Sequence, residues 1–130
     1  MSRQPLQVTN LTRGSEVAAH VRRADRAWSR MVGLLGRRSL AEDEGLLLTP
    51  CTSIHTFFML FPIDILYLDR EHAVVKAVKD LRPFRLSACL RGAHSILELP
   101  AGAIEASGTQ VGDRLALLPT GSGGPPGSER

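Results

Sequence analysis

Short apolar runs separated by turn residues are the feature that most restricts how this chain can fold. Such runs have the length of single strands, which typically span 3–10 residues. Many short strands joined by turns predict an α+β, mainly β fold, in which a small antiparallel sheet is rolled into a sandwich or an open barrel. The predicted strands cover residues 46–48, 54–61, 63–68, 73–78, 95–99 and 114–118.

The N-terminal part of the chain predicts a hairpin followed by a helix. Residues 6–11 form a predicted strand, Arg13-Gly14-Ser15 a turn, and residues 17–21 the returning strand. Asp25 can cap a helix that extends to Leu35. Apolar residues recur along this segment at helical spacing, which predicts that the helix packs on the sheet. They are Ala24, Ala27, Trp28, Met31, Leu34 and Leu35.

The length of 130 residues favours one domain, predicted over residues 6–118. Residues 1–5 are expected to be a flexible N-terminus. The segment 119–130 is rich in Gly, Pro and Ser, so we expect a disordered tail. Inside the domain, residues 81–91 have weak periodicity and predict a long loop, whereas residues 101–106 predict one helical turn.

Composition excludes several function classes. Hydrophobic residues make up 43% of the chain and charged residues 22%, which is typical of a globular protein. A net charge of +3 is small for a nucleic-acid binder, so we expect no nucleic-acid partner. No apolar run reaches the ~18–20 residues of a transmembrane helix. The N-terminus lacks the apolar stretch of an export signal, so the sequence predicts a cytoplasmic protein.

Several segments resemble an uncharacterised bacterial and archaeal family. They are Arg30-Met-Val-Gly-Leu-Leu-Gly-Arg37, Leu40-Ala-Glu-Asp-Glu-Gly-Leu46, Pro62-Ile-Asp-Ile-Leu-Tyr-Leu-Asp69, Leu97-Glu-Leu-Pro-Ala-Gly102 and Val111-Gly-Asp-Arg114. Together they resemble domain-of-unknown-function family number 192, over about residues 17–118. Many relatives carry Trp-Met-Lys-Asn-Thr where this chain has His55-Thr-Phe-Phe-Met59, so no role of that Lys and Asn is implied here. The resemblance implies no established activity, although many relatives bear export signals.

One group of polar residues could support catalysis. Asp64 lies between Ile63 and Ile65, and a carboxylate in an apolar strand needs hydrogen-bond donors. If residues 54–61 and 63–68 form a hairpin, His55 and Asp64 become cross-strand neighbours, and Asp64 can orient the imidazole for acid–base chemistry. Cys51 is the candidate nucleophile of such an enzyme. The structural interpretation, which we favour, has Asp64 binding backbone N–H groups.

Two cysteines and two histidines have spacings that superficially resemble a zinc site: Cys51, His55, Cys89 and His94. If residues 51–55 are extended, Cys51 and His55 lie roughly 13 Å apart, at ~3.3 Å per residue. That separation is too long for shared ligation, so the sequence favours free thiols over a metal site or a Cys51–Cys89 disulfide.

The leading functional prediction is a non-catalytic binding or accessory module for a small ligand or a protein partner. The alternative is the small enzyme described above. Candidate ligand-binding residues are Phe57, Met59, Arg82, Arg85 and Glu98. The aromatic run around Phe57 would supply an apolar floor and the arginines a cationic rim, which suits a small anionic or peptide ligand. Glu98 either points to solvent or pairs with Arg82 or Arg85. No glycine loop for phosphate is present outside the C-terminal segment, and we expect no cofactor.

Overall fold

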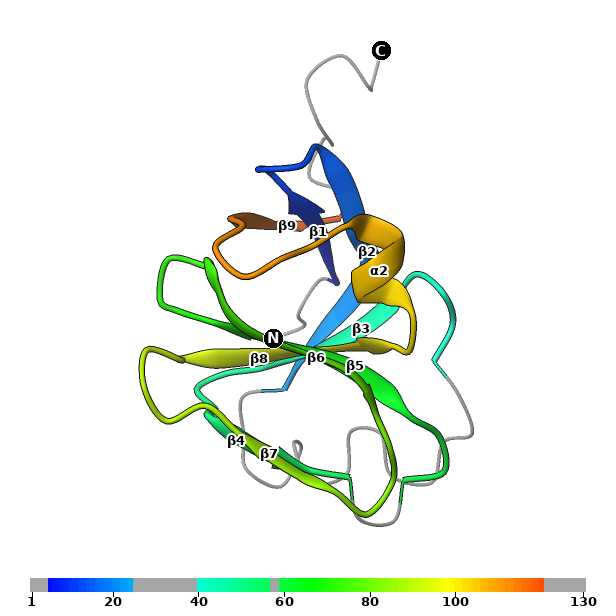
Figure 1. Cartoon of the computed structure of the whole chain (residues 1–130). Coiled ribbons are helices and arrows are strands. Elements are labelled where there is room, and N and C mark those ends of the chain that lie inside the picture. The colour runs from blue at the N-terminus through cyan, green and yellow to red at the C-terminus, as the bar shows by residue number, and fades with distance from the viewer. Residues whose placement is uncertain (1–4, 25–39, 57–58, 121–130) are drawn as a thin grey trace.

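The computed structural model describes residues 5–24, 40–56 and 59–120. Within these residues the chain forms nine strands and one short helix (Figure 1). In chain order the elements are β1 (Leu6–Asn10), β2 (Ser15–Ala24), β3 (Glu44–Leu48), β4 (Ser53–His55), β5 (Ile63–Leu68), β6 (Val74–Leu81), β7 (Leu86–Ala88), β8 (Ser95–Pro100), α2 (Ala103–Ser107) and β9 (Leu115–Pro119).

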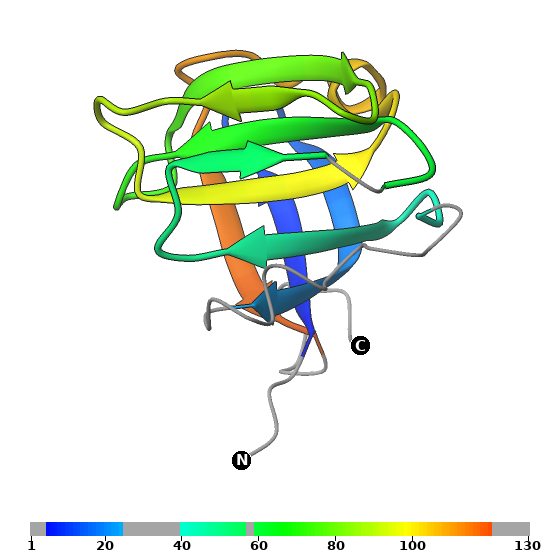
Figure 2. The same cartoon turned by 90° about the horizontal axis from the view of Figure 1, so that it is seen from below.

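The main sheet has seven strands in the order β6-β5-β8-β3-β2-β1-β9. Figure 2 shows that it curls, so that β9 and β1 lie across from β5 and β8. β6 and β9 are the two edge strands of this sheet. Ala73, just before β6, and Arg114, just before β9, form an antiparallel bridge, so the two edges meet at this point. The predicted small antiparallel sheet rolled into a sandwich or an open barrel is therefore confirmed in its coarser part: the fold is mainly β, with a curled seven-stranded sheet.

One pair of neighbouring strands departs from the antiparallel pattern. β2 and β3 are parallel, with Val21 opposite Gly45. Parallel neighbours need a long crossover connection, and here the chain between Ala24 and Glu44 makes it. The helix predicted over Asp25–Leu35 falls in that crossover and lies outside the described residues.

Alternation along the strands produces two cores on opposite faces of the sheet. On β8, Leu97 and Leu99 pack into the inner core with residues of β1, β2 and β9. Ile96 belongs to the outer core, which also holds Ile65 and Tyr67 of β5. Because both faces of β5 and β8 are covered, nearly every residue of these two strands is buried.

The predicted strand over residues 54–61 is wrong. Among the described residues of this segment, only Ile54 and His55 belong to a strand, β4, which pairs with β7 inside the predicted loop 81–91. Buried Thr56 anchors the turn at this end of the pair: its hydroxyl donates to the Arg82 carbonyl (2.6 Å) and accepts from the Arg85 N–H (2.8 Å). Met59 and Phe61 pack into the outer core from the connection that follows, so their burial does not need a strand.

Two element boundaries also differ slightly from the prediction. The helical turn is α2, which begins at Ala103 and ends before Gly108, a residue with a φ of 71°. β9 ends at Pro119, and the Thr120 N–H donates to the Pro5 carbonyl (2.8 Å). Pro119 and Thr120 therefore belong to the described fold, and residues 121–130, where the rest of the predicted tail falls, lie outside the described part of the chain. In the described ranges no helix is long and apolar enough to cross a membrane.

Candidate functional site

A two-stranded ribbon made of β4 and β7 lies over the outer face of the main sheet (Figure 1). Ile54 and Ser87 are opposite each other and point inward: Ile54 packs against the outer core, and the Tyr67 hydroxyl donates to the Ser87 hydroxyl (2.7 Å). The two flanking pairs point outward because side chains alternate along a strand. One of them joins His55 and Leu86.

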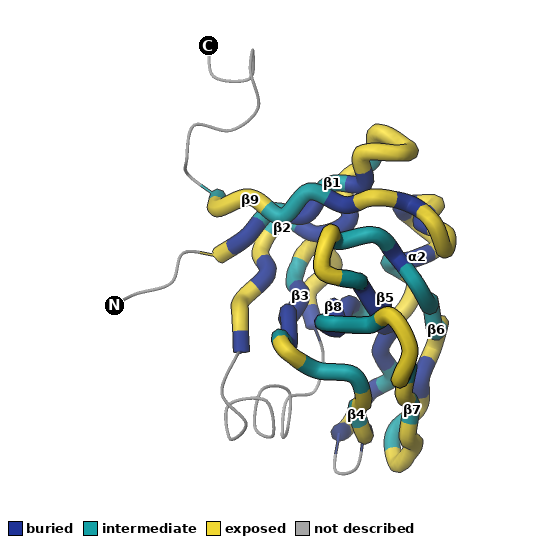
Figure 3. The backbone as a smooth tube through the Cα atoms, turned by 90° about the vertical axis from the view of Figure 1, so that its left-hand side faces the viewer, coloured by how far each residue is buried: buried dark blue, intermediate teal, exposed yellow. Residues whose placement is uncertain are grey.

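The outward face of the ribbon carries a shallow apolar cavity of about 370 Å³, lined by Ser53, Ile54, His55, Leu86, Ser87 and Ala88. Leu86 is 72% exposed, and Phe84 and Leu90 on the same segment are 59% and 80% exposed. Figure 3 shows the exposed stretches along β7 and the loops that flank it. Several large apolar side chains facing water on one short segment indicate an interaction surface.

The structure does not bring His55 and Asp64 together. β4 pairs with β7, whereas β5 pairs with β6 and β8, so the predicted hairpin is wrong. The Asp64 carboxylate instead accepts the backbone N–H groups of Asp80 (2.8 Å), Gly102 (3.1 Å) and Ile104 (3.0 Å). This bonding confirms the structural interpretation of Asp64 and removes the geometric basis of the His–Asp enzyme.

Glu98 is the most unusual residue under the ribbon. It is 4% exposed and lies opposite Leu46 and Ile65 on the outer-core face. No hydrogen bond or ion pair from another described residue reaches its carboxyl group, so neither the solvent-facing position nor the pairing with Arg82 or Arg85 is observed. Burial raises the pKa of Glu98 to about 8, which keeps it protonated at neutral pH.

Cys51 and Cys89 are free thiols, in agreement with the sequence interpretation. Both pack on the outer core, and each sulfur donates to a carbonyl two residues later, Ser53 for Cys51 (3.0 Å) and Arg91 for Cys89 (3.4 Å). The Cys51 N–H also donates to the His94 carbonyl (2.9 Å). Although Cys51 and His94 are joined by this backbone hydrogen bond, the described residues contain no group of three or more His, Cys, Asp or Glu that could hold a metal ion.

The described members of the predicted ligand-binding set do not gather in one place. Met59 is buried in the outer core, and Phe57 lies outside the described residues. Arg82 and Arg85 are exposed on the loop between β6 and β7, where Arg82 forms an ion pair with Asp80 (3.2 Å). The cationic rim therefore lies beside the ribbon, but the apolar side chains available to a ligand are those of β7.

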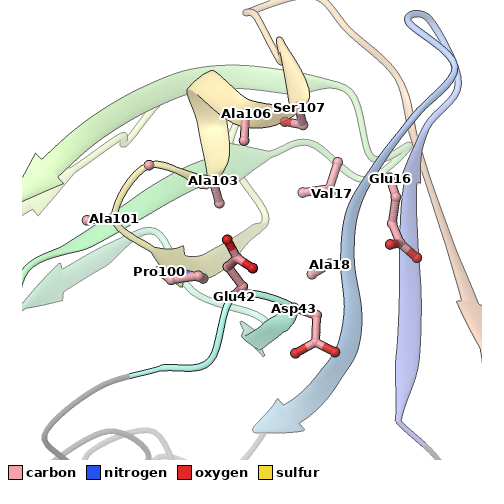
Figure 4. A pocket seen from close by; sticks show the side chains of 11 residues that line it. Glu16, Val17, Ala18, Glu42, Asp43, Pro100, Ala101, Ala103, Ala106 and Ser107 are labelled. Atoms are coloured by element: carbon pink, nitrogen blue, oxygen red, sulfur yellow. The ribbon is translucent and has the colours of Figure 1, made fainter.

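A second cavity, of about 410 Å³, lies between β2, α2 and the loop before β3. Glu16, Glu42 and Asp43 line it, yet Figure 4 shows their carboxylates pointing in different directions. Glu16 accepts the side-chain amide of Gln7 (2.9 Å), and Asp43 lies 3.5 Å from the His20 imidazole. Glu16 and Asp43 are therefore engaged in separate surface contacts, and the three carboxylates do not converge on one ligand.

Sequence reasoning missed Leu86, Ser87 and Tyr67 as members of this site. Their signal was weak because Leu86 and Ser87 belong to a three-residue strand inside a segment with little alternation. Lys76 was missed as well: its ammonium lies 5.6 Å from the Tyr67 ring centroid and donates to the Ala88 carbonyl (2.7 Å).

Comparison with known proteins places this fold in a family. The model of DUF192, described as an uncharacterized ACR, matches residues 8–117. The chain belongs to DUF192. A UPF0127 protein from Pyrococcus furiosus is 37% identical over 109 residues, which cover 82% of this chain and 93% of the relative. A UPF0127 protein from Thermococcus kodakarensis is 32% identical over 117 residues, which cover 87% of this chain and 74% of the relative.

Two solved structures share the DUF192 chain's fold. A Sinorhizobium meliloti protein that carries the provisional name of a transcription regulator matches with a TM-score of 0.76 at 22% identity, covering 89% of this chain and 94% of that one. A Novosphingobium aromaticivorans protein of unknown function matches with a TM-score of 0.71 at 18% identity, covering 86% and 83%. At these identities the similarity describes the fold alone.

Proposed function

We propose that this DUF192 protein is a non-catalytic binding module that takes an extended, acidic peptide segment along the outer edge of β7. The observation that carries the proposal is the ribbon itself, a two-stranded sheet with exposed apolar side chains on its outward face. A peptide that adds a strand to such an edge gains affinity from main-chain hydrogen bonds and specificity from side-chain pockets.

The backbone pattern of the ribbon supports strand addition at β7. The Cys89 N–H donates to Thr52 and the Thr56 N–H donates to Arg85, so these residues use the shared side of the ribbon. Bonding alternates along an antiparallel pair, so the N–H and C=O of Leu86 point to the outer edge. The Ala88 carbonyl points the same way and accepts from Lys76.

Charge favours an acidic partner. The segment 76–91 contains one carboxylate, Asp80, against the cations Lys76, Lys79, Arg82, Arg85 and Arg91. Asp80 is already paired with Arg82. Lys76 donates to the Ala88 carbonyl and Arg85 directly precedes Leu86, so both cations lie beside residues that line the cavity. They would steer a segment that carries Asp or Glu beside an apolar residue.

Selection of peptides from a random 12-residue display library on the purified protein tests this proposal. We expect the selected peptides to combine Asp or Glu with one large apolar residue, and to bind several-fold more weakly at high salt. The Leu86→Asp variant should lose binding by about 10-fold or more, because it removes the apolar anchor and places a like charge beside the peptide.

Val111→Asp is the matched control, since Val111 is 61% exposed but lies in a turn away from the ribbon. The peptide affinity of this variant should stay within about twofold of that of the parent, because the substitution lies on the surface and away from the proposed binding site. Selected peptides without acidic residues, or equal losses in both variants, would reject the ribbon as the binding site.

A further inference from the structure

A cavity of about 290 Å³ lies on the other side of the sheet from the ribbon, at the ends of β2 and β8 that are remote from α2. Its lining comes from well-separated parts of the chain: Arg23, Leu47, Thr49, Arg70, His72, His94, Ser95 and Leu117. Leu47 and Ser95 are 4% and 2% exposed and form its floor.

The charges that line this cavity have one sign. Arg23 comes from β2, Arg70 and His72 from the turn between β5 and β6, and His94 from the loop before β8. No carboxylate lines the cavity, and no described carboxylate forms an ion pair with Arg23 or Arg70. Guanidinium groups without an acidic partner, gathered around a recess, attract an anion.

The floor offers a further polar group. The Ser95 hydroxyl is buried, and none of the described residues makes a hydrogen bond with it. A buried hydroxyl without a partner is costly, and an oxygen of a bound ligand would satisfy it. This feature distinguishes the recess from a group of cations spread over a surface.

The turn that carries His72 is held in one conformation. The Asp69 carboxylate accepts the N–H groups of Glu71 (2.8 Å) and Ala73 (2.9 Å). His72 has a φ of 66°, and its carbonyl accepts the Leu115 N–H (3.0 Å). A non-glycine residue in this left-handed region is uncommon, and here the surrounding bonds impose it on a residue that lines the cavity.

We propose that this cavity binds the phosphate group of a small phosphomonoester. Arginine forks match the geometry of phosphate oxygens, and histidine and serine side chains can donate to the remaining oxygens. The recess fits a small molecule better than a nucleic acid, whose backbone is tracked by basic grooves or stripes rather than by one recess.

Protonation of His72 should couple to binding. Burial lowers the pKa of His72, and His94 and Arg23 lower it further, although Asp69 opposes them. Arg70 lines the cavity beside it, and Glu71 on the same turn is engaged by Arg114 at 3.8 Å. A bound dianion stabilises the imidazolium, so anion affinity should rise as pH falls from 8 to 6.

Calorimetric titration with phenyl phosphate, in a buffer free of other oxyanions, tests the site. We expect binding to the parent protein, and a loss of about 10-fold or more in Arg23→Gln and in Arg70→Gln, because each removes a charge-assisted bond. Arg22→Gln is the matched control: it lies on the same strand, is exposed and removes the same charge, but does not line the cavity. Its affinity should change less than about twofold.

A second titration with sulfate isolates the protein's own protonation, because sulfate stays dianionic over this pH range. The parent should bind sulfate more tightly at pH 6 than at pH 8, and His72→Gln should flatten that dependence. Circular dichroism and the Tm of each ligand-free variant verify folding. Equal losses in Arg22→Gln and Arg23→Gln, no phenyl phosphate binding by the parent, or tighter binding of a DNA duplex than of phenyl phosphate would overturn the proposal.

Discussion

At the residue scale, Glu98 combines burial with a missing partner. Its pKa of about 8 lies above the ordinary value of 4.5, so the folded protein holds a proton that the unfolded chain releases. Stability therefore falls as pH rises above about 4.5, and the loss levels off above pH 8. Glu98→Gln keeps the shape and removes the titration.

The resulting prediction is a pH-dependent gain in stability. Glu98→Gln should be more stable than the parent at pH 8, by roughly 1.4 kcal/mol for each unit by which the pKa is raised, and close to the parent at pH 4.5. Chemical denaturation at both pH values measures this. Glu105→Gln, an exposed change on α2, is the control and should show no such trend. A constant difference between parent and Glu98→Gln would contradict the raised pKa.

Asp64 should behave as a structural residue. Asp64→Asn loses acceptor capacity toward the N–H groups of Gly102, Ile104 and Asp80, and we expect a loss of roughly 2–4 kcal/mol from leaving buried donors unpaired. Chemical denaturation measures this loss, and the His55 ring resonances in the NMR spectrum should not move in the variant. A change in those resonances would restore the His–Asp pair.

Sequence reasoning located Asp64 correctly because a carboxylate between Ile63 and Ile65 has few acceptable environments. Sequence reasoning failed for Glu98. Its position between Leu97 and Leu99 suggests a side chain that faces solvent, but that rule holds only when one face of the sheet is open, and here both faces of β8 are covered. His72 and Arg23 carry no local signal at all: the turn after β5 and the end of β2 meet only in the folded sheet.

At the element scale, β3 has room for a glycine and nothing larger at position 45. A Cβ there would lie 3.0 Å from the Glu98 carbonyl oxygen and 3.1 Å from a Val21 methyl group. Gly45→Ala should therefore destabilise the protein by roughly 1–3 kcal/mol, as overpacking does. Thermal unfolding checks this, with Gly14→Ala as a comparison, where space is open and strain comes only from a φ of 72°. An unchanged Tm for Gly45→Ala would mean that β2 and β8, which lie on either side of β3, move away from it at little cost.

The elements predicted best were those whose boundaries are marked in the sequence by turn residues or glycine. The hairpin of β5 and β6 has an apolar run on each side of a polar turn, and α2 ends at a glycine. The run 54–61 misled because its apolar density resembles a strand, whereas its burial comes from Thr56 anchoring a turn and from Met59 and Phe61 packing in a connection. β7 was missed for another reason: it has three residues and lies in a segment with little alternation.

At the scale of the whole molecule, the curled sheet follows from many short strands, but its topology does not. The parallel pairing of β2 with β3 depends on where the crossover returns the chain, which no local pattern encodes. The ribbon arises for a similar reason: both faces of β5 and β8 are apolar, so the outer face needs a cover, and β4 and β7 from distant segments supply it.

The ribbon should open without unfolding the sheet. Its described hydrogen bonds to the rest of the molecule are few, chiefly from Tyr67 to Ser87, from Lys76 to Ala88 and between the backbones of Cys51 and His94. Elements with few buried contacts open at lower free energy than the core. We therefore expect the amide hydrogens of Thr56 and Cys89 to exchange faster than those of β5 and β8.

Ser87→Ala should widen that difference. It leaves the fully buried Tyr67 hydroxyl without its partner, at a cost of roughly 1–3 kcal/mol. Exchange at Thr56 and Cys89 should then accelerate by about 10-fold or more, while β5 and β8 keep their order as the slowest amides. Ser53→Ala is the control, since Ser53 is exposed and points outward from the same ribbon. If Ser87→Ala accelerated all amides equally, the ribbon and the sheet would open as one cooperative unit, and a peptide that pairs with β7 would have to bind a rigid edge.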